Sequence, residues 1–293
     1  MSPSRTSERA MPSGPGPSRP ARRGGRDARG SPYSGRAATP PGSGHLDGPE
    51  EEIGRPEAAS ASAPTDPRLI ALLDDGLARL AISLSATTRD GLLRYLALLA
   101  RWNRVYNLSA IRDPEQMVTS HLLDSLAVLP VLRQAVSPSD SRPVSLIDVG
   151  AGAGLPGIPL ALAWPALRIT LAEPVGKKAA FLRQCSAELG LAQRVQVHAA
   201  RVETLASSSL PADLIICRAF ASLRDYTRAI AHLVAPQTQV WAMKGRAPTE
   251  ELADLPTEWR LADLQPIEVP GLEAQRHLLR LESVAARREE LPS

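Results

Sequence analysis

The sequence has few lysines, few cysteines and no long apolar run. Lys177, Lys178 and Lys244 are the only lysines among its 34 Lys and Arg residues, so its cationic groups are almost all guanidiniums. Cys185 and Cys217 are its two cysteines, and it has five His. These numbers exclude a disulfide framework and offer no spacing for a metal site. No apolar stretch reaches the about 20 residues of a membrane span, and no signal-peptide core is present. We expect a soluble, intracellular protein without a bound metal or a membrane partner.

The N-terminal part differs in composition from the rest of the chain. Residues 1–66 hold most of the Pro, Gly and Ser clusters; residues 1–46 carry eight Arg against two acids, and 47–66 carry one Arg against six acids. Because so little apolar surface cannot offset the entropy of ordering a backbone, we expect a disordered extension over 1–66. An organelle transit peptide is the alternative, since the first residues are rich in Arg and Ser and poor in acids.

Net charge does not indicate a nucleic-acid partner. The formal net charge is +3, of which the extension (nine Arg minus eight acids) supplies +1. The other +2 is spread over 227 residues (293 minus 66). A nucleic-acid site would require a local basic patch, which composition does not reveal.

Residues 67–136 predict a helical cap. Apolar residues recur at three- and four-residue steps in "RLIALLDDGLARL" and in "SATTRDGLLRYLALLARW", where Ser85 is placed to cap a helix. A third helix is predicted over "DPEQMVTSHLLDSLAVLPVL", because Pro114 follows Asp113 at a favoured first-turn position. No strand signal interrupts these stretches.

Residues 137–293 predict an α/β domain. Short apolar runs ("VSLIDV", "LRITLAE", "RVQVH", "DLIICRA", "TQVWAMK") alternate with helical stretches such as "KKAAFLRQCSAELG". This alternation is typical of a parallel sheet covered on both faces. The last segments, "WRLADLQPIEV" and "HLLRLESV", flank a turn and predict an antiparallel hairpin at one edge. The expected fold is therefore a Rossmann-like sheet with a C-terminal antiparallel hairpin.

The stretch "LIDVGAGAGLPGIPLAL" follows the first predicted strand with a glycine-rich loop. Ligands of open parallel sheets bind beyond the carboxyl ends of the strands, and glycines let a ligand approach the bare backbone. Gly150 and Gly152 are thus candidate ligand contacts. Asp148 precedes them and could accept hydrogen bonds from a donor-rich ligand.

A second acid fixes the ligand class more closely. Glu173 ends the next predicted strand, 23 residues after Gly150, the usual place of an acid that holds both hydroxyls of a ribose. The ligand is therefore expected to be an adenosine-type cofactor. The residues favour S-adenosylmethionine, because an acid two positions before the first glycine suits an ammonium group better than a pyrophosphate. A nicotinamide dinucleotide is the alternative, since "GAGLPG" matches the dinucleotide pattern.

Seven ordered motifs carry a family resemblance: "RWNRVYNLSAIRDPEQM", "HLLDSL", "LIDVGAGAGLPGIPLAL", "GKKAAFL", "ARVETL", "CRAFASL" and "MKG". Over about residues 68–282, the chain resembles the bacterial ribosomal RNA small-subunit methyltransferase G family, also called glucose-inhibited division protein B. The resemblance implies a class I S-adenosylmethionine-dependent methyltransferase fold with a helical cap. It also implies methylation of N7 of a single guanine (position 527 in the usual numbering) of 16S rRNA, in the cytoplasm. The partner would be 16S rRNA or the small ribosomal subunit.

The resemblance also assigns donor contacts by position. They fall on Gly150 and Leu155 in the glycine loop, on Val202 and Glu203 in "ARVETL", and on Arg218 in "CRAF". Gly152 joins them from the glycine-loop argument and Glu173 from the spacing argument. For Arg218, a surface salt bridge is the alternative. Cys217 stands where relatives often have a hydroxyl residue.

No catalytic residue is predicted. Guanine N7 carries a lone pair and no proton, so its methylation needs no general base and can depend on alignment. The fourth strand ends in "IICRAF", without the Asn/Asp-Pro-Pro-aromatic run that holds an exocyclic amine, and no Pro precedes Cys217 as in thiolate enzymes. Methyl transfer to a protein or small molecule, and an RNA-binding protein without activity, are the further alternatives.

RNA contacts are less defined. Trp102 and Tyr106 lie four residues apart on one helix face and could stack a base, although packing of the cap onto the sheet is the favoured interpretation. His121 and Asp124 could touch substrate or form an intrahelical or interdomain hydrogen bond. The cationic candidates for phosphate contacts are Arg101, Arg104, Arg112, Lys244 and Arg246.

Overall fold

A computed structural model describes residues 66–136, 142–206 and 211–284. The predicted disordered extension lies outside these residues apart from Asp66, whose carboxylate accepts the N–H of Arg68 (2.9 Å) and caps the first helix. Among the described residues, no helix is both long and apolar enough to cross a bilayer. The same residues contain no group of three or more His, Cys, Asp or Glu that could hold a metal ion.

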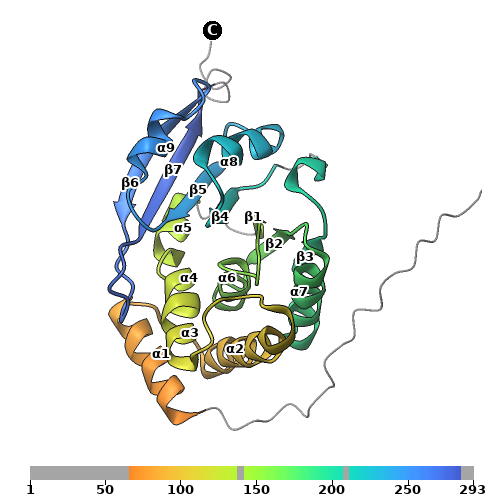
Figure 1. Cartoon of the computed structure of the whole chain (residues 1–293), viewed down its shortest axis with the longest axis vertical. Coiled ribbons are helices and arrows are strands. Elements are labelled where there is room, and N and C mark those ends of the chain that lie inside the picture. Colours follow the sequence, from red (N-terminus) through yellow and green to blue (C-terminus); the bar gives the residue numbers. More distant parts are fainter. Residues whose placement is uncertain (1–65, 137–141, 207–210, 285–293) are drawn as a thin grey trace, which may run out of the picture. The chain divides into compact units, whose positions relative to one another are not determined.

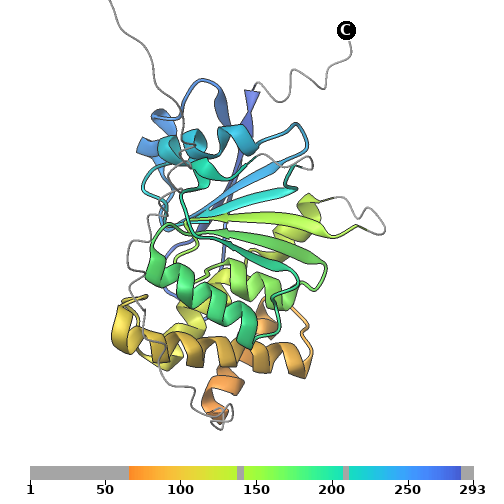
Figure 2. The same ribbon diagram turned by 90° about the vertical axis from the view of Figure 1, so that its right-hand side faces the viewer.

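A single seven-stranded sheet forms the centre of the described chain, in the order β3-β2-β1-β4-β5-β7-β6 (Figures 1 and 2). The strands β1 to β5 are parallel, and β7 pairs antiparallel with both β5 and β6. This confirms the expected Rossmann-like α/β fold with its antiparallel hairpin. The strands are β1 (Val144–Val149), β2 (Leu167–Ala172), β3 (Val195–His198), β4 (Leu214–Arg218), β5 (Gln239–Lys244), β6 (Trp259–Pro266) and β7 (His277–Ser283).

The alternation of side chains along the strands explains why both faces are covered. Leu146 of β1 points into one core with Ile216 of β4, whereas Ile147 and Ile215 point into a second core on the opposite face. The first core is closed by the cap and by α6 and α7, and the second by α8. The helices outside the cap are α6 (Gly157–Ala163), α7 (Gly176–Glu188), α8 (Leu223–Ile230) and α9 (Thr249–Ala253), with short 3-10 turns η2 (Val202–Thr204) and η3 (Ala231–Leu233).

The cap begins with two helices close to their predicted bounds. They are α1 (Pro67–Arg79) and α2 (Ala86–Tyr106). The Ser85 hydroxyl accepts the N–H of Thr88 (3.1 Å), so Ser85 caps α2 as predicted. Asn107 ends α2 in the left-handed conformation (φ 49°), which asparagine tolerates better than most residues.

The third predicted helix is interrupted. It starts at Pro114 as expected, with the Asp113 carboxylate on the N–H of Gln116 (2.8 Å). It then widens into a π-helical segment and breaks around Ala127 and Val128. The break precedes Pro130, which has no N–H to continue the helical ladder. The segments are α3 (Pro114–Met117), η1 (Val118–Leu123), α4 (Asp124–Leu126) and α5 (Leu129–Ala135).

The cap and the sheet share one hydrophobic core. The buried Tyr95 hydroxyl of α2 donates to the carbonyl of Ala153 in the glycine loop (2.7 Å). The Trp102 ring packs 5.5 Å from Phe181 of α7, and its Nε1 donates to Gln184 (3.1 Å). The helix α2 therefore fixes both the loop and the neighbouring helix α7.

Because the core is continuous, we expect the cap and the sheet to unfold together. Leu99 of α2 is fully buried, and its truncation to Ala should lower the free energy of unfolding by about 2–5 kcal/mol. Val105 on the same helix is 62% exposed, so Val105→Ala is the matched control, with an expected change within about 0.5 kcal/mol. Urea titrations followed by far-UV circular dichroism and by tryptophan fluorescence measure both variants. Separate transitions for the two signals would instead make 67–136 and 137–293 independent domains.

Candidate functional site

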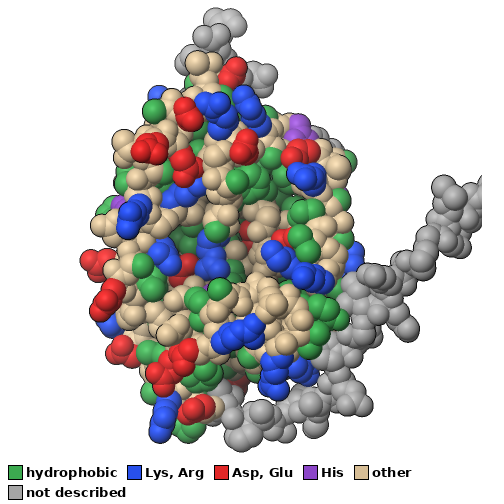
Figure 3. Space-filling model, in the orientation of Figure 1, with side chains coloured by type: hydrophobic (Ala, Val, Ile, Leu, Met, Phe, Trp, Pro, Cys, Tyr) green, Lys and Arg blue, Asp and Glu red, His purple; other side chains and the backbone are tan. Residues whose placement is uncertain are grey.

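All seven predicted donor contacts lie at the carboxyl ends of adjacent parallel strands. The views of Figures 1 and 3 look onto this end of the sheet, and Figure 3 shows a hollow there with Lys and Arg side chains at its rim. We call this hollow the crevice; it lies where an open parallel sheet binds its ligand. The contacts are Gly150, Gly152 and Leu155 after β1, Glu173 after β2, Val202 and Glu203 after β3, and Arg218 at the end of β4.

The glycine loop exposes bare backbone at its first bend. Gly150 and Gly152 have φ values of +69° and +60°, a region that residues with a side chain rarely adopt. The N–H of Gly150 donates to the carbonyl of Ala172 (2.9 Å), which pins the loop to the end of β2. A Cβ placed on Gly150 would lie 3.7 Å from the ring of Phe220, so this aromatic ring faces the loop.

Glu173 organises the loop from the neighbouring strand. Its side chain is almost fully buried, and its two oxygens accept the N–H of Gly152 (2.7 Å) and of Val175 (2.9 Å). The spacing argument assigns Glu173 to the ribose of the donor. In the structure its carboxylate also holds the loop in place, a contact that the spacing does not reveal.

Asp148 lies behind the loop rather than at its mouth. Its carboxyl group is fully buried; Oδ2 accepts the N–H of Gly157 (2.9 Å), and Oδ1 has no partner among the described residues. Burial raises the pKa of this carboxyl to about 7, although the Gly157 bond and the charge of Arg218 oppose the rise. The expectation that Asp148 accepts hydrogen bonds directly from a ligand is therefore not met by this arrangement.

The remaining loop contacts differ in exposure. Leu155 and Val202 are buried, at 5% exposure each, so only their backbone groups could meet a polar ligand. Glu203 is exposed on η2, beside Val202. Val202 and Glu203 therefore border the crevice on the β3 side.

Arg218 is part of a charge cluster that joins three segments. Its Nη1 donates to Asp124 Oδ2 (2.8 Å) and to the carbonyl of Ser120 (3.2 Å) in the cap. The other oxygen of Asp124 accepts Nε of Arg276 (2.6 Å), which comes from the C-terminal hairpin. Asp124 is 2% exposed. Its interdomain hydrogen bonds agree with one of the two interpretations given for this residue, whereas no sequence signal pointed to Arg276.

Comparisons with known proteins identify the family. The model of the rRNA small subunit methyltransferase G family matches residues 89–279. A protein of that name from Methylibium petroleiphilum is 46% identical over 215 residues, covering 73% of this chain and 95% of the relative. One from Burkholderia pseudomallei is 46% identical over 217 residues, covering 73% of this chain and 91% of the relative. This chain belongs to the rRNA small subunit methyltransferase G family.

The structural relatives are more distant than these sequence relatives of the rRNA small subunit methyltransferase G family. TrmN from Thermus thermophilus has a TM-score of 0.43 at 18% identity, covering 57% of this chain and 53% of that one. The METTL16 methyltransferase domain has a TM-score of 0.47 at 15% identity, covering 73% of this chain and 92% of that one.

Within this family member, the aromatic candidates for base stacking have a packing role. Trp102 is 2% exposed and its ring lies 5.2 Å from Tyr106 and 5.5 Å from Phe181. A base cannot reach Trp102 in this arrangement. The favoured interpretation, packing of the cap onto the sheet domain, is therefore confirmed for Trp102.

The arginines around this helix divide into bound and unbound ones. Arg101 pairs with Glu188 (3.3 Å), and Arg112 donates to the carbonyl of Asn103 (3.2 Å) and to the side chain of Asn107. Arg104 is exposed and forms no hydrogen bond or ion pair within the described residues. Of these three candidates for phosphate contacts, Arg104 alone has an unengaged guanidinium.

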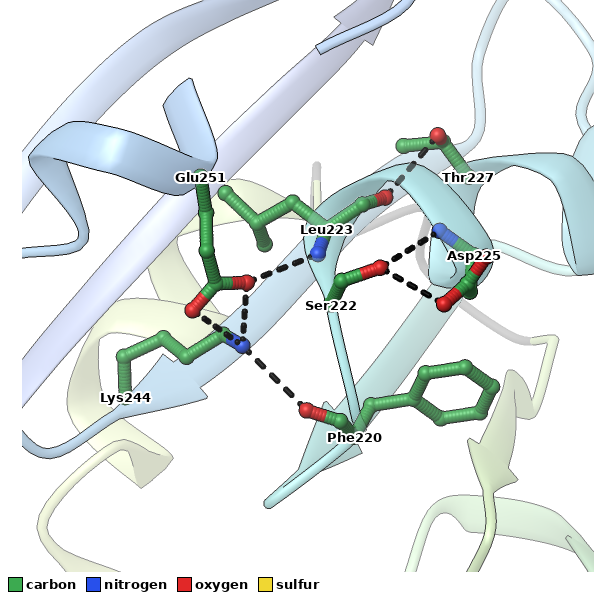
Figure 4. A network of polar contacts seen from close by, with 7 residues as sticks. All are labelled: Phe220, Ser222, Leu223, Asp225, Thr227, Lys244 and Glu251. Atoms are coloured by element: carbon green, nitrogen blue, oxygen red, sulfur yellow. Dashed lines mark hydrogen bonds and ion pairs between the residues drawn. The ribbon is translucent and has the colours of Figure 1, made fainter. Parts of the chain in front are cut away.

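Lys244 is also bound within the protein (Figure 4). Its ammonium donates to both oxygens of Glu251 (3.0 and 2.8 Å) and to the carbonyl of Phe220 (3.3 Å). Glu251 in turn accepts the N–H of Leu223 (2.8 Å), which begins α8. Lys244 therefore fixes the loop between β4 and α8. Its ammonium is already bound to protein groups, which makes it a weaker candidate for a phosphate contact than the sequence indicates. Arg246, two residues further, is exposed.

His121 and Cys217 are buried groups beside the crevice. His121 Nε2 lies 2.8 Å from the Ser109 hydroxyl, and desolvation lowers the pKa of its imidazole to about 4. His121 is thus neutral near pH 7 and belongs to the interior of the cap. Burial raises the pKa of the Cys217 thiol far above its usual range, so it carries no thiolate for nucleophilic attack.

Replacement by Ala should affect Gly157, at the end of the glycine loop, and Gly176, at the start of α7, very differently. A Cβ on Gly157 would lie 2.4 Å from Leu171 Cδ2 and 2.7 Å from Asp148 Oδ2, whereas a Cβ on Gly176 meets nothing within 4 Å. Gly157→Ala should therefore lower the free energy of unfolding by about 1–3 kcal/mol and weaken binding of S-adenosylhomocysteine, while Gly176→Ala should be neutral. Urea denaturation and calorimetry measure the two effects. Equal behaviour of the two variants would contradict the tight packing assigned to Gly157.

The raised pKa of Asp148 predicts that the free energy of unfolding depends on pH. Its folded-state pKa of about 7 lies above the ordinary value of 3.8, so the folded state binds the extra proton between these values. The contribution of Asp148 to stability therefore falls as the pH rises from about 4 through 7. His121, with its lowered pKa, acts in the opposite sense below its ordinary value of 6.5, but it does so equally in every variant.

Asp148→Asn removes this titration and keeps an acceptor for Gly157. Relative to the unmodified protein, the variant should gain stability from about pH 5 to pH 8, by on the order of a few kcal/mol. Asp213→Asn is the control, because hydrogen bonds from Arg142 and Ser145 outweigh burial and lower the pKa of Asp213, so its effect is constant in this range. Urea titrations at several pH values measure both differences. A difference that does not vary with pH for Asp148→Asn would refute the assignment.

Proposed function

We propose that this protein transfers a methyl group from S-adenosylmethionine to N7 of a single guanine of 16S rRNA, in the cytoplasm. Membership of the rRNA small subunit methyltransferase G family carries the reaction class. The glycine loop after β1, held by the buried carboxyl groups of Asp148 on β1 and Glu173 after β2, supports the donor. The target atom is the one that the family resemblance implies.

The residues around the crevice suit a donor that carries an amino acid and a ribose. Bare backbone at Gly150 and Gly152 leaves room for the amino-acid part. The orphaned Oδ1 of Asp148 behind the loop makes a nearby cation favourable, because a positive charge stabilises the ionised carboxyl. These two observations fit the ammonium group of S-adenosylmethionine better than the anionic pyrophosphate of a dinucleotide.

The other donor contacts follow from the same geometry. We assign Glu173 to the ribose hydroxyls, and Val202 and Glu203 to the edge of the adenine. Within the described residues, Arg218 forms no hydrogen bond through Nε or Nη2, and we assign these groups to the carboxylate of the donor. Leu155 completes the loop side of the pocket.

The reaction asks little of the side chains. The sulfonium of the donor, when bound, supplies both the methyl group and a good leaving group. Guanine N7 has a lone pair and no proton to remove, so alignment and exclusion of water can supply the rate enhancement, of which orientation provides up to about 7–11 kcal/mol. The neutral, buried Cys217 and His121 agree with a site that uses no nucleophile and no general base.

Methylation of small ribosomal subunits that lack this modification tests the proposal. Purified protein with labelled S-adenosylmethionine should transfer one methyl group per subunit, and chemical cleavage specific for N7-methylguanine should map it to a single guanine of 16S rRNA. Naked 16S rRNA is the parallel substrate and distinguishes free RNA from an assembled particle. Label in a protein or a small molecule instead of RNA, or a methyl group on another atom, would refute this function.

A further inference from the structure

The cluster of Arg218, Asp124 and Arg276 holds more positive than negative charge. One carboxylate serves two guanidiniums, through Nη1 of Arg218 and Nε of Arg276. Asp124 is 3% exposed in its side chain, while the two arginines are 22% and 26% exposed. The pair therefore presents one uncompensated positive charge toward solvent at the carboxyl end of the sheet.

Each guanidinium also keeps donors available. Besides Asp124, Arg276 donates only from Nη1 to the carbonyl of Gln275 (2.9 Å) within the described residues, which leaves Nη2 unengaged. Arg218 uses Nη1 alone. Planar guanidiniums whose Nε or Nη1 is fixed by a carboxylate are preoriented donors for an oxyanion.

Arg276 also lies close to the turn after β5. A Cβ built on Gly245 would lie 3.9 Å from Nη1 of Arg276, and Nδ1 of His277 lies 3.0 Å from the carbonyl of Gly245. Arg276 thus borders the turn after β5, where Arg246 is exposed. At the end of β5, Lys244 is paired with Glu251, whereas Arg246 forms no ion pair within the described residues.

We propose that Arg276 binds a phosphodiester of the RNA substrate, and that Asp124 is the positioning residue that holds Arg276 and Arg218 next to each other at the carboxyl end of the sheet. This inference rests on the proposed function. The Arg218 guanidinium then faces the donor, the Arg276 guanidinium faces the RNA backbone, and Asp124 fixes their separation. A buried ion pair by itself is weak evidence for a role in stability. Because this cluster carries one more positive than negative charge, binding of an anion would balance it.

Replacement of Arg276 by Gln tests the phosphate contact in the full chain. For unmodified small subunits, we expect KM to rise on the order of tenfold, the loss of one charge-assisted hydrogen bond. The affinity for S-adenosylhomocysteine should stay unchanged. The slope of log Kd for RNA against log salt should fall by about 0.7–0.9, one released phosphate contact. Arg276→Lys keeps the positive charge but not the planar guanidinium, so its KM should lie between those of the unmodified protein and Arg276→Gln.

Arg260→Gln is the matched control. Arg260 lies on the same hairpin and also binds a carboxylate, that of Glu282 (2.6 Å), but on β6 at the outer edge of the sheet. We expect no change in its KM or salt slope. If Arg276→Gln behaves like Arg260→Gln, Arg276 is a structural link only and the proposal is wrong.

Asp124→Asn tests the positioning role. It should raise KM for the subunit and also weaken S-adenosylhomocysteine binding, because both arginines lose their anchor. A rise in unfolding sensitivity without either change would leave only a structural role and overturn the proposal. Weaker donor binding in Arg276→Gln with unchanged KM for RNA would assign the anion to the donor carboxylate instead, and would also overturn the proposal.

Failure of the proposed function is distinguishable from failure of this inference. If the unmodified protein binds the donor but never methylates RNA, the proposed function is wrong, whatever the arginine variants do.

Discussion

The bend between β1 and α6 is held from inside by two buried carboxylates, and the crevice depends on this arrangement. Asp148 accepts the N–H of Gly157 at the start of α6, and Glu173 accepts the N–H of Gly152 at the middle of the bend. Two acids that are taken out of water must be hydrogen-bonded or neutralised. The raised pKa of Asp148 shows how far burial opposes its ionised form. The loop therefore depends on two buried carboxyl groups that the fold tolerates because backbone N–H groups donate to both.

Buried hydrogen bonds also connect the cap to the sheet. The Tyr95 hydroxyl donates to the carbonyl of Ala153 in the glycine loop, and the Asp124 carboxylate binds Arg218 of β4 and Arg276 of the hairpin. The helices of the cap therefore act as part of the site and not as a separate appendage. Their apolar residues share one core with α6 and α7.

The sequence predicts the sheet and the position of the loop, because both depend on local patterns. Strand bounds follow from apolar runs, Ser85 caps its helix, and the distance from Gly150 to Glu173 is a property of one β-α-β unit. Pairings across the fold were not accessible in this way. Arg276 meets Asp124 across 152 residues, and nothing in its neighbourhood distinguishes it from the many other arginines of the chain.

Some local features were also missed, for physical reasons that can be named. The π-helical segment over Val118–Leu123 keeps the apolar spacing of an α-helix, so periodicity cannot separate the two. Lys244 follows a strand in the same way as a ligand contact does, but its bond to Glu251 comes from a helix formed later in the chain. The sequence predicts a positive charge at the end of this strand and leaves its partner undetermined.

The late position of Arg276 has a consequence for how the site is assembled. Asp124 is synthesised well before the residue that completes its pair, so until the β7 hairpin has joined β5, one guanidinium alone must balance its carboxylate. Contacts between residues so far apart form slowly, because the intervening chain must first be ordered. We therefore expect the side of the crevice that carries Arg276 to form after the side that carries the glycine loop.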